Sequence, residues 1–303
     1  MNRVLVTGAT GFVGRHAIPA LLERDFEVHA AARTTLPLAG VAWHPVDLLD
    51  GSSLDDVVRE VQPTHLLHLA WYAEHGRFWD AHENLDWVAA STRLLRAFAN
   101  AGGRRVVVAG TCAEYDWSGD CCTRSTPLQP ATLYGACKNS LRQIVEAYAS
   151  SAGLSAAWGR IFFTFGPSEP PERLIASVAR ALVSGDTVAC SSGMQVRDLL
   201  YVEDLADALA ALLDSEVEGA LDLGSGEALT LRHVVERLER VGGRRDVARF
   251  GELPRRAEPD RIVADIGRLR DEVRWRPRHG LDEGLERTLA WWVARSHGDG
   301  GSE

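Results

Sequence analysis

Residues 4–14 read Val4-Leu5-Val6-Thr7-Gly8-Ala9-Thr10-Gly11-Phe12-Val13-Gly14, and this stretch decides the fold. A run rich in β-branched residues gives way to three glycines, and an apolar helical pattern follows. Gly8 permits a tight turn off the strand, Gly11 lets backbone amides approach a pyrophosphate, and Gly14 lets the helix pack against the strand. The first turn of that helix offers free N–H groups and a positive dipole end. Rather than a purely structural turn, the pattern predicts a dinucleotide cradle built from Gly8, Thr10, Gly11, Phe12, Val13 and Gly14.

Length and composition describe an ordinary soluble globular chain. Of its 303 residues, 46% are apolar and 25% are charged, so the chain can bury one large α/β core with a smaller appendage. The net charge of −9 argues against a nucleic-acid-binding surface. The five cysteines, Cys121 and Cys122 among them, show no paired spacing. We therefore expect reduced thiols, without a disulfide framework and without a metal site.

The sequence offers no membrane segment. No apolar run approaches the roughly 18 residues that a bilayer span requires. Arg3 leads directly into the first strand, which leaves no room for a cleavable leader. We therefore expect a cytoplasmic protein with no membrane partner.

The second predicted strand covers residues 27–33, and the residues at its end indicate whether the chain prefers NAD or NADP(H). A unit that prefers NAD places an acidic residue there, where it accepts both ribose hydroxyls. This sequence instead has Arg33 followed by Thr34, and an arginine fork beside hydroxyls suits a 2′-phosphate. The pattern favours NADP(H), with a plain surface arginine as the alternative. A third strand over 41–46 is followed by Asp47 and Leu48, which are assigned to the adenine.

Strands alternate with helices at steps of about 30 residues, which predicts a parallel sheet covered by helices on both faces. Ligands bind such sheets beyond the carboxyl ends of the strands. The fourth strand ends in Leu69 and Ala70, which are assigned to the cofactor.

The loop after the fourth strand is a candidate substrate site because it begins at that same edge. A helical pattern over 78–101 follows it, and Asn84 near its start is expected to give structural support. The candidate substrate contacts in the loop are Trp71, Tyr72 and His75.

The regular alternation breaks after a sixth strand at 155–161, where Pro167 begins a proline-rich turn. We expect a dinucleotide-binding domain over 1–165 and a mainly substrate-binding lobe over 166–295. Residues of about 197–225 are expected to return to the first domain. The tail over 296–303, rich in Gly and Ser, is expected to be disordered.

Tyr134 and Lys138 stand one helical turn apart, with about 5–6 Å between their Cβ atoms. A phenol with a pKa near 10 is a poor acid–base group at neutral pH, and a cation within roughly 4–6 Å lowers that pKa by about one to three units. Lys138 is thus expected to lower the pKa of Tyr134 and to reach the nicotinamide ribose, so both residues are assigned to catalysis and to the cofactor. Thr111, at the end of the fifth strand, supplies a hydroxyl for the same carbonyl oxygen, and it completes the predicted catalytic set.

With these motifs the chain resembles the extended short-chain dehydrogenases/reductases, in particular the family of nucleoside-diphosphate-sugar epimerases, dehydratases and 4-ketoreductases. The resemblance runs from the glycine motif to the final tryptophan-containing helix. It implies a Rossmann-type doubly wound parallel sheet with a smaller C-terminal substrate-binding lobe, catalytic roles for Thr111, Tyr134 and Lys138, and a homodimer.

A later stretch extends this resemblance. Arg197-Asp198-Leu199-Leu200-Tyr201 is similar to the family segment whose arginine meets the sugar-nucleotide diphosphate. Arg197 is therefore assigned to the substrate, with a surface ion pair to Asp198 or Glu203 as the alternative.

Two departures from the family pattern reduce the number of reactions that we expect for this chain. The 4,6-dehydratases of the family carry an Asp-Glu pair directly after the catalytic threonine, whereas this chain has Cys112 and Ala113. Dehydration is therefore disfavoured, and Cys112 is assigned to the substrate pocket beside Thr111. Glu114 is displaced by one position, which on an extended segment turns it to the other face. Arg33 argues against the tightly held NAD of the 4-epimerases.

We therefore predict an NADPH-dependent 4-ketoreductase that reduces a nucleotide-linked 4-keto-6-deoxysugar, with Tyr134 as the proton donor. Three alternatives stay open. An epimerase of the same fold is one, in which His75 is a possible acid–base group. A ketoreductase for a non-sugar natural-product ketone and a non-catalytic dinucleotide sensor are the others.

Overall fold

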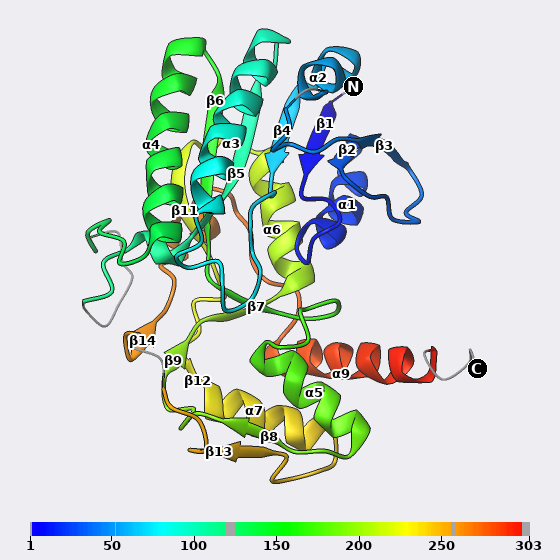
Figure 1. Ribbon diagram of the computed structural model, residues 1–303, viewed down its shortest axis with the longest axis vertical. Helices are drawn as coiled ribbons and strands as arrows, with labels where there is room; N and C mark the ends of the chain where they lie inside the picture. Colours follow the sequence, from blue (N-terminus) through cyan, green and yellow to red (C-terminus); the bar gives the residue numbers. More distant parts are fainter. Residues whose placement is uncertain (1, 52, 119–124, 256–257, 299–303) are drawn as a thin grey trace.

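The computed structural model describes residues 2–51, 53–118, 125–255 and 258–298 (Figure 1). The expectations for Cys121 and Cys122 lie outside these residues. The first half of the chain forms β1 (Arg3–Thr7), α1 (Gly14–Leu22), β2 (Glu27–Ala32), β3 (Val41–Pro45), α2 (Leu54–Val61), β4 (His65–His68), α3 (Glu83–Asn100), β5 (Arg105–Thr111), the 3₁₀ turn η1 (Cys112–Glu114) and α4 (Leu133–Ala152).

The second half adds shorter strands and five helices to the described chain. They are β6 (Ser155–Ile161), β7 (Phe163–Phe165), α5 (Leu174–Ser184), β8 (Val188–Cys190), β9 (Val196–Arg197), β10 (Leu199–Tyr201), α6 (Val202–Asp214), β11 (Gly219–Leu223), β12 (Leu229–Thr230), α7 (Leu231–Val241), β13 (Ala248–Phe250), β14 (Arg261–Ile262), α8 (Gly267–Asp271) and α9 (Leu281–Gly298).

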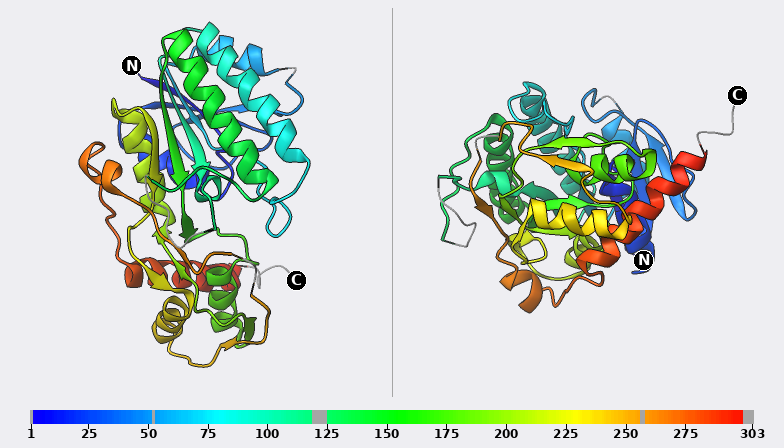
Figure 2. Two further views of the ribbon diagram at one scale, coloured as in Figure 1. Left: turned by 90° about the vertical axis from the view of Figure 1, so that its left-hand side faces the viewer. Right: turned by 90° about the horizontal axis from the view of Figure 1, so that it is seen from below.

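A seven-stranded sheet in the order β11-β6-β5-β4-β1-β2-β3 forms the main body, and all of its pairings are parallel. Alternation along β1 sends Val4 and Val6 to the core under α1 and α6, and sends Leu5 to the core under α2, α3 and α4. Helices cover both faces of the sheet (Figures 1 and 2). The predicted Rossmann-type doubly wound sheet is therefore confirmed.

The chain reverses its direction of strand addition at β1, which has β4 on one side and β2 on the other. At such a switch point the loops beyond the carboxyl ends diverge and leave a crevice for a ligand. The loop after β1, the ends of β2 and β4, and Thr111 at the end of β5 all lie along this edge.

A smaller lobe lies beyond the carboxyl edge of the sheet, where α5, α7 and α9 pack around the short strands β8 and β13 (Figures 1 and 2). Two stretches of the second half return to the main body. Residues 202–223 supply α6 and the edge strand β11, and residues 266–275, which were predicted to belong to the lobe, place Leu269 and Trp275 in the core of the sheet.

The C-terminal boundary differs from the prediction. Helix α9 continues through Gly298, so residues 296–298, predicted to be disordered, are helical, and residues 299–303 lie outside the description. None of the helices in the described chain has the length and apolar character that a membrane crossing requires.

Candidate active site

The glycine loop has the tight fold that the sequence predicts. Gly8 has a φ of +72°, and a Cβ there would lie 2.6 Å from the backbone nitrogen of Ala70 at the end of β4. A Cβ on Gly14 would lie 2.1 Å from the carbonyl oxygen of Gly8. The Gly11 N–H donates to that same oxygen at 3.0 Å. The loop is therefore folded so tightly that positions 8 and 14 have no room for a side chain.

The cradle also has the electrostatics that a pyrophosphate needs. Helix α1 begins at Gly14 without a side-chain cap, because the N-cap residue is Val13, and its first turn holds no acidic residue. Arg15 braces the loop by donating from Nη2 to the carbonyl oxygen of Thr10 at 2.8 Å. The positive end of the helix dipole is thus left for an anion. These residues fit the diphosphate of a nicotinamide dinucleotide.

The residues assigned to the adenosine end lie around the ends of β2 and β3. Arg33 and Thr34 are exposed and follow β2 directly. Asp47 is half-buried and accepts the N–H of Leu49 at 3.0 Å, and Leu48 is buried. Leu69 and Ala70 follow β4, and Ala70 touches the glycine loop. All of these positions share the edge of the sheet at which the cradle opens.

The predicted catalytic residues come together from β5 and α4. Thr111 is the last residue of β5 and caps η1, since its hydroxyl accepts the Ala113 N–H at 3.2 Å. The Tyr134 phenol and the Thr111 hydroxyl lie close enough for Thr111 to oppose the rise in the pKa of the phenol. Lys138, one turn further along α4, donates from Nζ to the carbonyl oxygen of Ala109 at 2.9 Å. The juxtaposition predicted from spacing is thus present.

The electrostatics of the pair differ from the prediction. Burial raises the pKa of the Tyr134 phenol, and the Thr111 hydroxyl offsets only part of that effect. Burial also lowers the pKa of Lys138 to about 7, against the opposing charge of Glu114. The expectation that Lys138 lowers the pKa of Tyr134 is therefore wrong, because desolvation dominates and the opposing contribution comes from Thr111, not from Lys138.

Aromatic side chains from the loop after β4 enclose this pair. The Trp71 ring centroid lies 3.9 Å from Lys138 Nζ. Phe78 and Trp79 meet the Tyr134 ring edge-on, at centroid distances of 4.9 and 5.9 Å. Sequence reasoning missed Phe78 and Trp79, because they fall in a stretch predicted to start a helix, whereas α3 begins only at Glu83.

The other substrate candidates of this loop are not gathered at the phenol. Tyr72 donates its hydroxyl to Glu74 at 2.7 Å, and Arg77 pairs with the same carboxylate at 2.9 Å. Glu74, His75 and Arg77 are exposed. Cys112, in contrast, is buried directly after Thr111.

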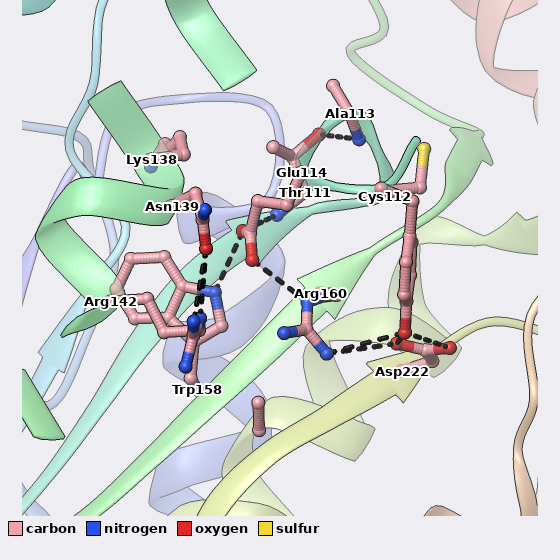
Figure 3. A network of polar contacts seen from close by, with 12 residues as sticks. Thr111, Cys112, Ala113, Glu114, Lys138, Asn139, Arg142, Trp158, Arg160 and Asp222 are labelled. Atoms are coloured by element: carbon pink, nitrogen blue, oxygen red, sulfur yellow. Dashed lines mark hydrogen bonds and ion pairs between the residues drawn. The ribbon is translucent and has the colours of Figure 1, made fainter. Parts of the chain in front are cut away.

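Glu114 has a structural role, and Figure 3 shows its carboxylate directed at Trp158 and Arg160. Its side chain is fully buried. One oxygen accepts the Thr111 N–H at 2.9 Å and the Trp158 indole N–H at 2.8 Å. The other accepts from Arg160 Nε at 2.8 Å. The carboxylate thus fixes the turn that presents Thr111.

Arg197 does not form the surface ion pair with Asp198 or Glu203 that was the alternative interpretation of the sequence. It is 1% exposed in β9 and pairs through Nη2 with Glu258 at 2.8 Å. Its Nη1 donates to the carbonyl oxygens of Val196 and Pro259. Asp198, the alternative partner, instead accepts the N–H groups of the turn after β11. A diphosphate would have to compete with Glu258 for this guanidinium.

Comparison with known proteins identifies the relatives of the chain. The sequence model of one family, described as NAD dependent epimerase/dehydratase family, matches residues 4–224. The UDP-glucose 4-epimerase of Azospirillum brasilense is 29% identical, over 96% of this chain and 91% of that protein.

Two solved structures share the fold closely. The UDP-glucose 4-epimerase of Thermus thermophilus, in complex with NAD, superimposes with a TM-score of 0.85 at 28% identity, over 96% of this chain and 98% of that one. MoeE5, in complex with UDP-glucuronic acid and NAD, has a TM-score of 0.85 at 28% identity, over 97% of this chain and 100% of that one.

Proposed function

The chain belongs to the NAD-dependent epimerase/dehydratase family, and from this premise we propose that it is an epimerase acting at C4 of a nucleoside-diphosphate sugar. As a member it is an extended short-chain dehydrogenase/reductase enzyme that binds a nicotinamide dinucleotide. One arrangement carries the proposal. The Tyr134 phenol lies beside the Thr111 hydroxyl and stands one turn from Lys138, at the edge of the sheet where the glycine loop opens.

Tyr134 and Thr111 have different roles at the reacting oxygen of the sugar. When bound, a nicotinamide dinucleotide supplies a reversible acceptor for the hydride of the sugar C4–H bond. Tyr134 would take the proton of the C4 hydroxyl as the phenolate and, as the phenol, would return it to the C4 oxygen in the reverse half-reaction. Because burial raises its pKa in this structure, the phenol must first lose its own proton to solvent. Thr111 donates a hydrogen bond to the reacting oxygen. The Lys138 ammonium lies one turn of α4 from Tyr134 and donates to the carbonyl oxygen of Ala109.

Epimerisation fits the site because one acid–base group serves both half-reactions. Elimination of water would need a further acid and base, and Cys112 and Ala113 occupy the positions where the dehydratases carry them. Glu114 does not replace them, since it is buried against Arg160. Two of the relatives described above are UDP-glucose 4-epimerases. Our sequence-based prediction, the 4-ketoreductase, is the second candidate, and Arg33 is the observation that favours it.

The two candidates differ in redox balance, which gives the test of function. With UDP-glucose or UDP-galactose and a catalytic amount of cofactor, we expect interconversion of the two sugars without a net change in the absorbance of the reduced nicotinamide. Product formation is followed by chromatography and by proton NMR of the anomeric signal. Stoichiometric oxidation of NADPH with a 4-keto-6-deoxysugar nucleotide, and no interconversion, would replace the epimerase by the reductase.

A preference for NADP(H) is a separate proposal that rests on Arg33. We expect Arg33→Asp to weaken NADP(H) binding by roughly 10- to 100-fold and to change NAD(H) binding by less than about threefold, because a charged hydrogen bond to a phosphate contributes about 1.5–3 kcal/mol. Quenching of protein fluorescence measures both affinities. Arg59→Asp is the matched control, since Arg59 is exposed in the last turn of α2, which leads to the opposite end of the sheet. Equal losses of affinity for NADP(H) and NAD(H) would show that Arg33 does not discriminate between the two cofactors.

We further propose that the lobe of α5, α7 and α9 binds the sugar nucleotide, with Arg197 released from Glu258 toward the diphosphate and Cys112 beside the sugar. The homodimer implied by the family resemblance is also a proposal. It is supported by Leu85 and Ile144, which leave apolar surface exposed on α3 and α4, two helices that pack against each other.

A further inference from the structure

Lys138 is the only lysine among the 303 residues of the chain. It is 4% exposed, and two groups hold its ammonium. Nζ donates to the carbonyl oxygen of Ala109 at 2.9 Å. The Trp71 ring lies 3.9 Å away, centroid to Nζ. A tryptophan face attracts a cation through its ring quadrupole, and most strongly where water is excluded.

Trp71 is itself held in place by Asn84. The indole Nε1 donates to Asn84 Oδ1 at 2.8 Å, and because an indole nitrogen only donates, the amide oxygen must face it. The amide nitrogen of Asn84 donates to the carbonyl oxygens of Phe78 and Ala81, at 2.7 and 2.8 Å. Asn84 is fully buried. Its amide therefore fixes the ring and the loop that bears it with three directed hydrogen bonds.

We propose that Trp71 is a positioning residue for Lys138, whose ring face holds the ammonium in its charged form before the cofactor arrives, with Asn84 fixing the ring. The assignment deepens the proposed function, since it concerns the lysine of the same catalytic set. Trp71 was predicted to contact substrate; here it acts on the catalytic machinery through Lys138.

The other charged groups near Lys138 do not offset the effect of burial on its pKa. Glu114 of η1 favours the ammonium, but burial still lowers the pKa of Lys138 to about 7. His68 of β4 adds no charge near neutral pH, because burial lowers its pKa to about 3. Tyr134 on the same helix stays protonated, since burial raises its pKa. The Trp71 face thus acts on a lysine that is close to losing its proton at physiological pH.

Because the chain has a single lysine, the pKa of Lys138 can be measured without interference from other lysines. Protein grown with lysine labelled at Cε gives one labelled side-chain signal, which is titrated in the folded protein without cofactor or substrate. We expect Trp71→Leu to lower the titration midpoint by about one pH unit, because the desolvated cation–π contact that favours the ammonium is lost. The ε-methylene protons should also lose an upfield ring-current shift. Trp71→Phe, which keeps a ring, should retain most of both effects.

Trp87→Leu is the matched control. Trp87 lies on α3, and its ring packs on that of Trp71 at a centroid distance of 6.2 Å. The substitution should leave the midpoint unchanged. An unchanged midpoint in Trp71→Leu, or an equal shift in Trp87→Leu, overturns the inference. If Trp71→Leu fails to fold, the wild type alone decides: ε-proton shifts equal to those of the urea-unfolded chain also overturn it. A failed epimerisation assay would leave this titration untouched, so the two proposals fail separately.

Discussion

Replacing Tyr134 by phenylalanine is expected to lower turnover by about 10²- to 10⁴-fold and to change the affinity for the dinucleotide by less than about threefold. The substitution removes the phenolic hydroxyl, which meets Thr111, and keeps the ring. The edge-on contacts with Phe78 and Trp79 therefore persist, so the fold of the site should not change. Turnover is measured as interconversion of the sugar nucleotides, and affinity by fluorescence titration.

Tyr72→Phe is the matched control for this prediction. Its phenol lies in the same loop but donates to Glu74 on the exposed side, so its removal should leave turnover within about twofold of the wild type. A Tyr134→Phe enzyme that turns over at the wild-type rate would show that another group moves the proton. Equal losses in both variants would point instead to a disturbed loop.

Features set by local spacing could be predicted from the sequence. The glycine loop, the alternation that buries both faces of the sheet, and the one-turn separation of Tyr134 and Lys138 each follow from a few neighbouring residues. These features predict a cofactor cradle and a catalytic set at one edge of the sheet. The expected extended segment at Glu114 is wrong, because residues 112–114 form the 3₁₀ turn η1 and Glu114 folds back onto the Thr111 N–H.

Contacts between distant segments could not be predicted in this way. Glu258, the partner of Arg197, lies 61 residues further along the chain, and no local pattern links them. The Trp71 contact with Lys138 joins a loop to a helix, and the raised pKa of Tyr134 depends on the rings that cover it. Missing acids at 112 and 113 disfavour dehydration, but they do not separate reduction from epimerisation, because one tyrosine serves both.

The largest effect on stability is expected from Arg160→Leu. Arg160 neutralises the buried carboxylate of Glu114 at 2.8 Å, with side chains 8% and 0% exposed, and lies 3.8 Å from Asp222. Removing the guanidinium leaves a buried charge without its counterion, which costs about 3–5 kcal/mol of the free energy of unfolding. Urea denaturation followed by circular dichroism measures this loss. Arg59→Ala, which breaks the exposed pair with Asp56, should cost less than about 1 kcal/mol.

The double variant Glu114→Gln, Arg160→Leu separates charge from packing. Because it removes both members of the ion pair, we expect it to recover part of the stability lost in Arg160→Leu, and the coupling energy follows from the cycle. Thr111 should still be affected, since its N–H is held by the Glu114 carboxylate. Turnover per folded molecule should therefore stay below that of the wild type even where stability returns. An Arg160→Leu protein no less stable than Arg59→Ala would show that the buried network does not hold the catalytic turn in place.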